Sequence, residues 1–316
     1  MNNSHTKINN LNNLNILNKI NNLPNIEKIK LKCINIKKFF ITNSSNVELI
    51  VLSDFDRTIT TGDSKECHEF MNDFCRKIMK KKLCTSPIPN NPDFRDEHHI
   101  RPMHYANFIK KLANVFNAGH DAWIERHQSY IMSKFNETEL NEEISTETNI
   151  KIRKDVNKTF NFALQNNIIV IIASAGIHNI IRRFFPATKI LIDSHHITFD
   201  NKSIIENIEP KISNFHIEKE HLVDRMDFLS NKKSSGKILV GIMIGDSEVD
   251  FKIMNDYPDE NQCFIKVAFI NKKQELNLKY IKYVEENCDI ILNGDQESFE
   301  IIYKLLEILI KIRDSI

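Results

Sequence analysis

Three short apolar runs, rich in branched residues, constrain the fold of this chain more than any other feature. They read VELIVLS at 47–53, NIIVIIAS at 167–174 and KILVGIMIG at 237–245. Runs of this length and composition are typical of strands buried on both faces of a parallel sheet. Segments with helical patterns separate and follow them, and two shorter apolar runs predict further strands. The helical segments are 62–82, 148–166, 177–185, 215–229, 247–255, 273–286 and 296–314, and the further strands are 264–269 and 289–292.

The alternation of strands and helices predicts an α/β fold with a doubly wound, mainly parallel sheet. In such a sheet, ligands bind at the carboxyl ends of the strands. The 120 residues from Asp54 to Ser174 are far more than a crossover between two strands needs. A second unit is therefore predicted to be inserted between the first two strands.

The first 46 residues differ in composition from the rest of the chain. They carry seven Lys and one Glu, a charge of +6, so the remaining residues carry −5 of the total of +1. Asn, Ile, Leu and Lys dominate this stretch, and such low-complexity composition resists packing into a core. We expect 1–46 to be a disordered tail or a loosely attached arm, with organelle targeting or binding to nucleic acid or a membrane surface as alternative roles.

The remaining composition favours a globular protein of the cytoplasm. No run approaches 18 apolar residues, and the N-terminus lacks the pattern of a secretory signal. The six cysteines form no C-x-x-C pair, so they predict reduced thiols rather than a zinc site or disulfides. The negative charge beyond the tail argues against a nucleic-acid partner, and nothing predicts a membrane partner. The oligomeric state is left open.

Polar residues follow each of the three long strands directly. The first strand ends in Asp54-Phe55-Asp56, the second in Ser174-Ala175-Gly176 and the third in Gly245-Asp246-Ser247, with Asp250 after it. Residues i and i+2 of an extended segment point the same way, so Asp54 and Asp56 face one pocket while Phe55 packs away from it.

Carboxylates this close repel one another unless a cation compensates. A hard divalent ion with oxygen ligands is the expected cation, and Mg²⁺ is the natural choice because it also accepts a phosphate oxygen. Asp246 is well placed to complete its ligands. One carboxylate of the first motif can then attack phosphorus, while its neighbour delivers and removes a proton.

The order D-x-D-x-T, then Ser-Ala-Gly after a strand, then G-D-S-x-x-D resembles the haloacid dehalogenase-like (HAD-like) phosphohydrolases. Within them the chain is most similar to the cytosolic pyrimidine 5′-nucleotidases, through SDFDRTIT, IIASAGIHNII and IGDSEVDFKIM. The resemblance covers 47–75 and 165–316, is poor over 76–150 and is absent from the tail. It implies a Rossmann-like core, Mg²⁺ and an aspartyl-phosphate intermediate.

The resemblance also implies roles for single residues. Asp54 would be the nucleophile and a metal ligand. Asp56 would be the general acid and base, and its carbonyl would touch the metal. The Ser174 side chain and the amides of Ala175 and Gly176 would hold the phosphoryl oxygens at a helix N-terminus.

Two further motifs complete the implied site. Asp246 would bind Mg²⁺ directly, and Asp250 would bind it through water or orient a neighbour. The lysine that neutralises the nucleophile and phosphate is expected to be Lys219, within ISNFHIEKEH, with Lys211 as the alternative.

By the same resemblance the inserted unit, 65–159, would be a mostly helical cap over a core of 47–64 and 160–316. The cap would recognise the nucleoside, with Glu66, Tyr105 and Trp123 as candidate contacts. The alternative is that the cap aromatics form its own core. Other candidates for the acidic contact to the nucleobase are Glu69, Asp96 and Glu97. The five histidines between 98 and 127 lack the i, i+4 spacing of a helical zinc site.

Together these features predict a Mg²⁺-dependent phosphomonoester hydrolase whose partner is a small-molecule nucleotide. The expected activity is that of a 5′-nucleotidase on pyrimidine nucleoside monophosphates, with phosphotransfer to a nucleoside as a side activity. One alternative is a phosphatase for another small phosphomonoester, such as phosphoserine or phosphocholine. A second alternative is a binding module that has kept the fold without the activity.

Overall fold

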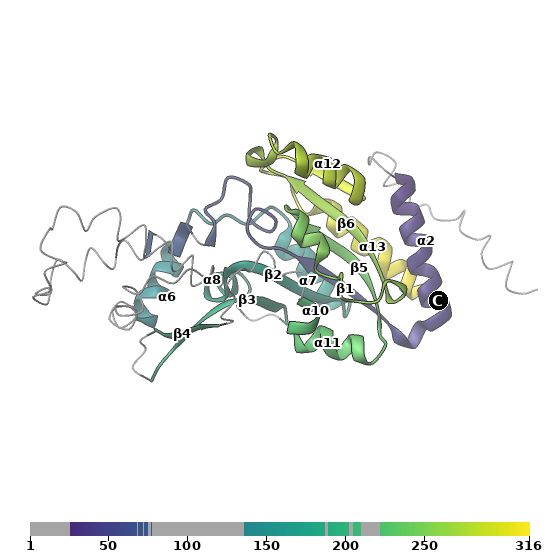
Figure 1. Cartoon of the computed structure of the whole chain (residues 1–316), viewed down its shortest axis with the longest axis horizontal. Helices are drawn as coiled ribbons and strands as arrows, with labels where there is room; N and C mark the ends of the chain where they lie inside the picture. Colours follow the sequence, from purple (N-terminus) through teal and green to yellow (C-terminus); the bar gives the residue numbers. More distant parts are fainter. Residues whose placement is uncertain are drawn as a thin grey trace, which may run out of the picture.

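The computed structural model describes residues 26–67, 69–71, 73–74, 77, 136–186, 189–201, 205–209 and 222–316. Its centre is a seven-stranded sheet of order β4-β3-β2-β1-β5-β6-β7 (Figure 1). The strands are β1 (Val47–Ser53), β2 (Ile169–Ile177), β3 (Leu191–Phe199), β4 (Ile205–Glu209), β5 (Ile238–Gly245), β6 (Gln262–Ile270) and β7 (Ile290–Asn293). All neighbours are parallel except the antiparallel pair β3 and β4. The predicted α/β fold with a mainly parallel sheet is confirmed.

Helices cover both faces of this sheet, as a doubly wound sheet requires. On one face, α2 (Ile26–Asn43), α7 (Val156–Gln165) and α13 (Glu300–Asp314) contribute to the larger hydrophobic core. On the other face, α10 (Leu222–Arg225), α11 (Asp227–Ser234) and α12 (Leu278–Asn287) contribute to a second core. Successive side chains of β1 point into opposite cores, because side chains alternate along a strand. Leu49 and Val51 lie in the first core, and Ile50 and Leu52 lie in the second.

The remaining elements of the described part of the chain are two further helices and four 3₁₀ turns. They are the helices α6 (Glu137–Thr146) and α8 (His178–Phe184) and the 3₁₀ turns η3 (Ser44–Asn46), η6 (Glu248–Lys252), η7 (Asp259–Asn261) and η8 (Lys272–Gln274). Within these described residues, no helix combines the length and the apolar character that crossing a membrane would need.

The expectation of a disordered tail over 1–46 is wrong for residues 26–46. These residues form α2 and η3, and α2 lies beside α13 and β6 (Figure 1). Ile29, Cys33, Ile36 and Phe40 lie three or four residues apart, so they share one face of the helix, and all four are buried. The Asn-rich overall composition of 1–46 concealed this apolar stripe. Residues 1–25 lie outside the described residues.

Other local features also differ from the sequence predictions. The predicted helix over 148–166 is helical only from Val156, because the residues before it pair with the loop after β1: Thr60 and Ile152 form an antiparallel bridge. The hairpin of β3 and β4 was not predicted, and it adds the antiparallel edge of the sheet. The division into a core and a cap at 65–159 stays a prediction, since most of the insert lies outside the described residues.

Candidate active site at the carboxyl ends of the strands

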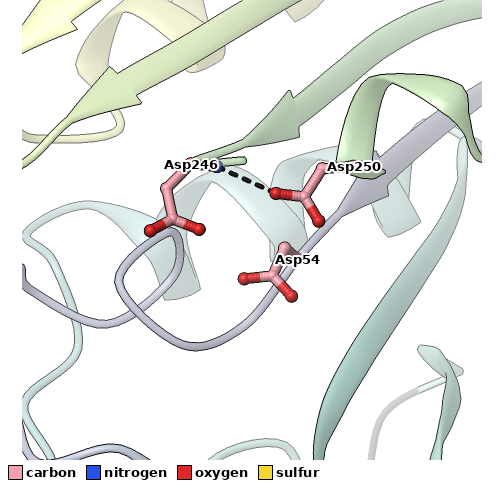
Figure 2. Close-up of side chains that lie close together, drawn as sticks. All are labelled: Asp54, Asp246 and Asp250. Carbon is pink, nitrogen blue, oxygen red and sulfur yellow. Dashed lines mark hydrogen bonds between the residues drawn. The ribbon is translucent and has the colours of Figure 1, made fainter. Parts of the chain in front are cut away.

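Neighbouring parallel strands bring the acidic motifs together. β1 and β5 pair in register up to Ser53 and Ile244, and the Asp54 N–H then donates to the Ile244 carbonyl at 3.1 Å. Asp246 follows β5 directly, and Asp250 lies in η6 just beyond. Carboxylate oxygens of Asp54, Asp246 and Asp250 all lie within 4.8 Å of one another (Figure 2). This acidic triad joins residues almost 200 positions apart in the chain.

All three members of the triad are nearly inaccessible to solvent. Asp54 is 5% exposed, Asp246 8% and Asp250 1%. Buried like charges repel strongly because the interior screens them poorly. The donors are all oxygen, which hard divalent cations prefer, so the buried triad implies a divalent metal.

Hydrogen bonds orient two of the carboxylates. Asp250 Oδ2 accepts from the N–H groups of Asp246, at 3.1 Å, and Ser247, at 2.8 Å, and from the Ser247 hydroxyl at 2.7 Å. The bond from the Ser247 N–H is half of a capping box at the start of η6, in which the Ser247 side chain accepts in turn from the Asp250 N–H. The Gln274 amide donates to both the carbonyl oxygen and Oδ2 of Asp246, each at 2.6 Å. Asp250 is thus oriented by its own turn, and Asp246 by a residue that follows β6.

The last residue of β5 must be glycine for this arrangement. A Cβ atom on Gly245 would lie 2.3 Å from the Asp250 Cβ and 2.7 Å from Asp250 Oδ2. No real Cβ approaches another carbon so closely, so any side chain here would push Asp250 away from the triad.

Asp56 lies outside the triad, in the turn after β1. Its Oδ1 accepts from the Cys67 N–H at 3.1 Å. Arg57, the next residue, adopts a left-handed conformation with a φ of 61°. Phe55 is fully buried in the larger hydrophobic core and packs against Phe184, in agreement with the prediction that it packs away from the pocket.

The Ser-Ala-Gly motif lies just before the last residue of β2, which pairs with β1 in parallel, so it lies at the same edge of the sheet as the triad. Ser174 is buried, and its Oγ accepts from the Gly176 N–H at 3.0 Å. The helix α8 begins two residues later, at His178.

The structure describes only some of the other candidate residues. Glu66 is buried, forms an ion pair with Arg57 and lies 3.6 Å from the Lys273 ammonium. Glu69 accepts from the Glu66 N–H at 3.0 Å. A contact of Glu66 with substrate stays a prediction. Lys219, Lys211, Tyr105, Trp123, Asp96 and Glu97 lie outside the described residues.

Sequence reasoning missed Gln274 and Arg153. Gln274 stands in the charged stretch KKQE, which resembles an ordinary solvated surface, and Arg153 lies in a segment predicted as helix. Neither position carries a motif. Only the folded chain brings them to the acidic motifs.

The fold and site define a hydrolase of the HAD-like superfamily. A solved structure described as cytosolic 5′-nucleotidase IIIB bound to cytidine matches 93% of this chain and 95% of its own, with 17% identity and a TM-score of 0.57. A human protein named 7-methylguanosine phosphate-specific 5′-nucleotidase is 22% identical over 82% of this chain and 84% of its own length. Its mouse counterpart is 20% identical, over 82% and 83%.

The chain belongs to the pyrimidine 5′-nucleotidase (UMPH-1) family, whose model matches residues 106–310. It is a 5′-nucleotidase, and its substrate is a nucleotide.

Proposed function

We propose that this protein hydrolyses nucleoside 5′-monophosphates with Mg²⁺, through a phosphoryl group carried on Asp54. The observation that supports this most directly is the buried triad, in which the Asp54 carboxylate lies within 4.8 Å of two further carboxylates. A carboxylate held this way can act as a nucleophile only when the surrounding negative charge is compensated.

In the first step, an Asp54 oxygen forms a bond to phosphorus and the bond from phosphorus to the nucleoside O5′ breaks. Asp56, protonated, donates its proton to the departing O5′. In the second step, Asp56 takes a proton from water, the water oxygen bonds to phosphorus, and the bond to Asp54 breaks. Inorganic phosphate leaves, Asp54 is a carboxylate again and Asp56 is again protonated.

The other site residues have binding roles in this proposal. The Ser174 hydroxyl, the amides of Ala175 and Gly176, and Lys219 or Lys211 would hold the phosphoryl oxygens. Asp54, Asp246, Asp250 and the Asp56 carbonyl would hold Mg²⁺. When bound, Mg²⁺ would supply positive charge that lets the phosphate approach the acidic residues.

The substrate class rests on the family. Its name and the cytidine bound to the solved relative support a pyrimidine nucleotide. The relatives named for 7-methylguanosine phosphate favour a second candidate, an N7-methylated purine nucleotide. Both carry a planar base that the cap, proposed at 65–159, would contact through Tyr105, Trp123 or Glu66. The name of the solved relative also supports a cytosolic location.

Release of phosphate from a panel of monophosphates tests the proposal. The panel contains UMP, CMP, AMP, GMP, 7-methyl-GMP, phosphoserine and phosphocholine, each with Mg²⁺ and with EDTA, and the Asp54→Asn protein gives the background. We expect Mg²⁺-dependent turnover that is fastest with UMP and CMP. Preference for 7-methyl-GMP would select the second candidate. Turnover of phosphoserine or phosphocholine alone would contradict a nucleotidase.

A further inference from the structure

Arg153 is the most unusual buried side chain that the proposed mechanism does not use. It is 2% exposed and is the largest fully buried side chain of the described residues. Arginine is almost never buried this completely unless its donors are satisfied. Its hydrogen bonds therefore indicate what it does.

The Arg153 guanidinium donates hydrogen bonds to the turn that carries Asp56. Arg153 Nε donates to the Thr58 carbonyl at 3.0 Å, and Nη2 donates to the Arg57 carbonyl at 2.9 Å. The Asn271 amide also donates to the Arg57 carbonyl, at 3.1 Å. Two buried side chains thus hold the carbonyl of the residue that directly follows Asp56.

The backbone at Arg57 needs such support. Its φ of 61° is a left-handed conformation that costs free energy for any residue with a side chain. Such conformations persist where the surroundings determine them, and they cluster at functional sites. Arg57 lies between Asp56 and the buried residues Thr58 and Ile59.

The same guanidinium joins this turn to the loops after two other strands. Nη2 donates to Asn271 Oδ1, after β6, at 2.6 Å. Nη1 donates to three carbonyls after β7: those of Gly294 at 3.3 Å, Asp295 at 3.0 Å and Glu297 at 3.1 Å. Only a planar group with several donors in fixed directions can bridge three loops in this way.

Arg153 itself is held in place. Its N–H donates to the Ile59 carbonyl at 2.9 Å, and its guanidinium lies 4.1 Å from the centre of the Phe269 ring. Burial lowers the pKa of Arg153 to about 10, an effect opposed first by Asp246, so the group is still charged at neutral pH. A positive charge thus lies close enough to Asp246, one member of the acidic triad, to interact with it.

We infer that Arg153 is a positioning residue for the nucleotidase reaction: with Asn271 it fixes the turn at Arg57 and Thr58, and so holds Asp56 where it can protonate the leaving oxygen. The inference rests on the proposed function. A positioning role can be distinguished from a purely structural one, because misplacement of Asp56 lowers turnover of different substrates to different extents. A poor leaving group needs the proton from Asp56, and a good leaving group needs it far less.

The test compares two substrates in Arg153→Met, Arg153→Lys and wild-type protein. UMP has a poor leaving group, the uridine O5′, and p-nitrophenyl phosphate has a good one, p-nitrophenolate. We expect kcat for UMP to fall about 100-fold in Arg153→Met, the order of loss that misplacement by an ångström causes. With p-nitrophenyl phosphate we expect a fall of less than about 10-fold. Arg153→Lys should show the same selectivity, because lysine keeps the charge but cannot reach three loops. If Arg153→Met does not fold, the comparison of Arg153→Lys with wild-type protein is the test.

A matched control removes an arginine away from the site. Arg313 donates to the Asn166 carbonyl at 2.7 Å from α13, and Arg313→Met should leave the ratio of the two substrates unchanged. Amide hydrogen exchange over 57–61 gives a readout without turnover. It should become at least about tenfold faster in both Arg153 variants, while exchange within β5 stays the same.

The outcomes separate the two proposals. If wild-type protein turns over neither substrate, the proposed function is wrong and this inference falls with it. An active wild type whose Arg153 variants lose both substrates in equal proportion would overturn the role of Arg153 alone. Unchanged exchange over 57–61 would also overturn it, whatever happens to turnover.

Discussion

The side-chain amide of Gln274 donates hydrogen bonds of 2.6 Å to both the carbonyl oxygen and Oδ2 of Asp246. Gln274 Oε1 in turn accepts from the Asn271 N–H at 2.8 Å, which fixes the orientation of the amide. A residue on the loop after β6 thereby orients a carboxylate that follows β5. Groups that orient metal ligands in this way set affinity for the metal.

Replacement of Gln274 should therefore weaken the response to metal. We expect Gln274→Leu, which keeps the volume, to raise the Mg²⁺ concentration for half-maximal activity by about tenfold, with a smaller change at saturating Mg²⁺. Gln296→Leu is the control, because Gln296 bonds only the exposed Asp63 among described residues. An unaltered Mg²⁺ titration in Gln274→Leu would show that Asp246 needs no orienting donor.

Removal of the proposed nucleophile should abolish turnover without unfolding the protein. Asparagine in Asp54→Asn keeps the size but cannot carry a phosphoryl group, so kcat should fall more than about 10³-fold. Unfolding monitored by circular dichroism should show equal or greater stability, since one buried like charge is removed. Asp314→Asn, at an exposed position on α13, is the control and should keep full activity. Turnover within tenfold of wild type would assign the nucleophile elsewhere.

The close approach of Gly245 to Asp250 predicts a severe effect of one methyl group. In Gly245→Ala the new Cβ would lie 2.3 Å from the Asp250 Cβ, so we expect a loss of about 1–3 kcal/mol in the free energy of unfolding. Mg²⁺-dependent activity should fall with it, because Asp250 must move. Urea unfolding and a Mg²⁺ titration measure the two effects.

Gly236→Ala is the matched control for that substitution. Gly236 has a positive φ of 63°, but nothing lies within 4 Å of its Cβ position. Only backbone strain of about 1 kcal/mol is expected there, with normal activity at saturating Mg²⁺. Normal Mg²⁺-dependent activity in Gly245→Ala as well would mean that contact with Asp250 is unimportant.

His178 predicts a loss of stability in acid. Burial, with smaller effects of His196 and Arg182, lowers the pKa of His178 from 6.5 to about 4. Between these values the unfolded chain binds a proton at His178 that the folded chain does not, so the free energy of unfolding falls as pH decreases. The contribution of neutral His178 is fully present above about pH 6.5 and is lost towards pH 4.

In His178→Gln this part of the pH dependence should disappear. Urea midpoints at pH 7 and pH 5 measure it: the difference between the two should be smaller in the variant than in wild type. If both proteins lose the same stability between these pH values, other groups cause the acid sensitivity.

Local patterns were enough to predict five of the six strands in parallel pairing, all except β3. An apolar run of 47–53 can be recognised because every residue must face a helix layer, and the structure places β1 at the same residues. The motif residues could be found because each follows such a run directly. Average composition misled the prediction for α2, where it concealed an apolar stripe. Periodicity misled it over 148–155, where pairing with the loop after β1 overrides helix propensity.

The sequence by itself determined which residues stand at the carboxyl ends of the strands, because strand runs and their polar ends are set by near neighbours in the chain. Only the tertiary structure decided that β1 lies between β2 and β5, which brings Asp54 to Asp246 and Asp250. It also decided that Gln274 and Arg153 hold the loops that carry these residues. Such contacts join positions far apart in the chain, and they depend on strand order and packing, which no local pattern of side chains records.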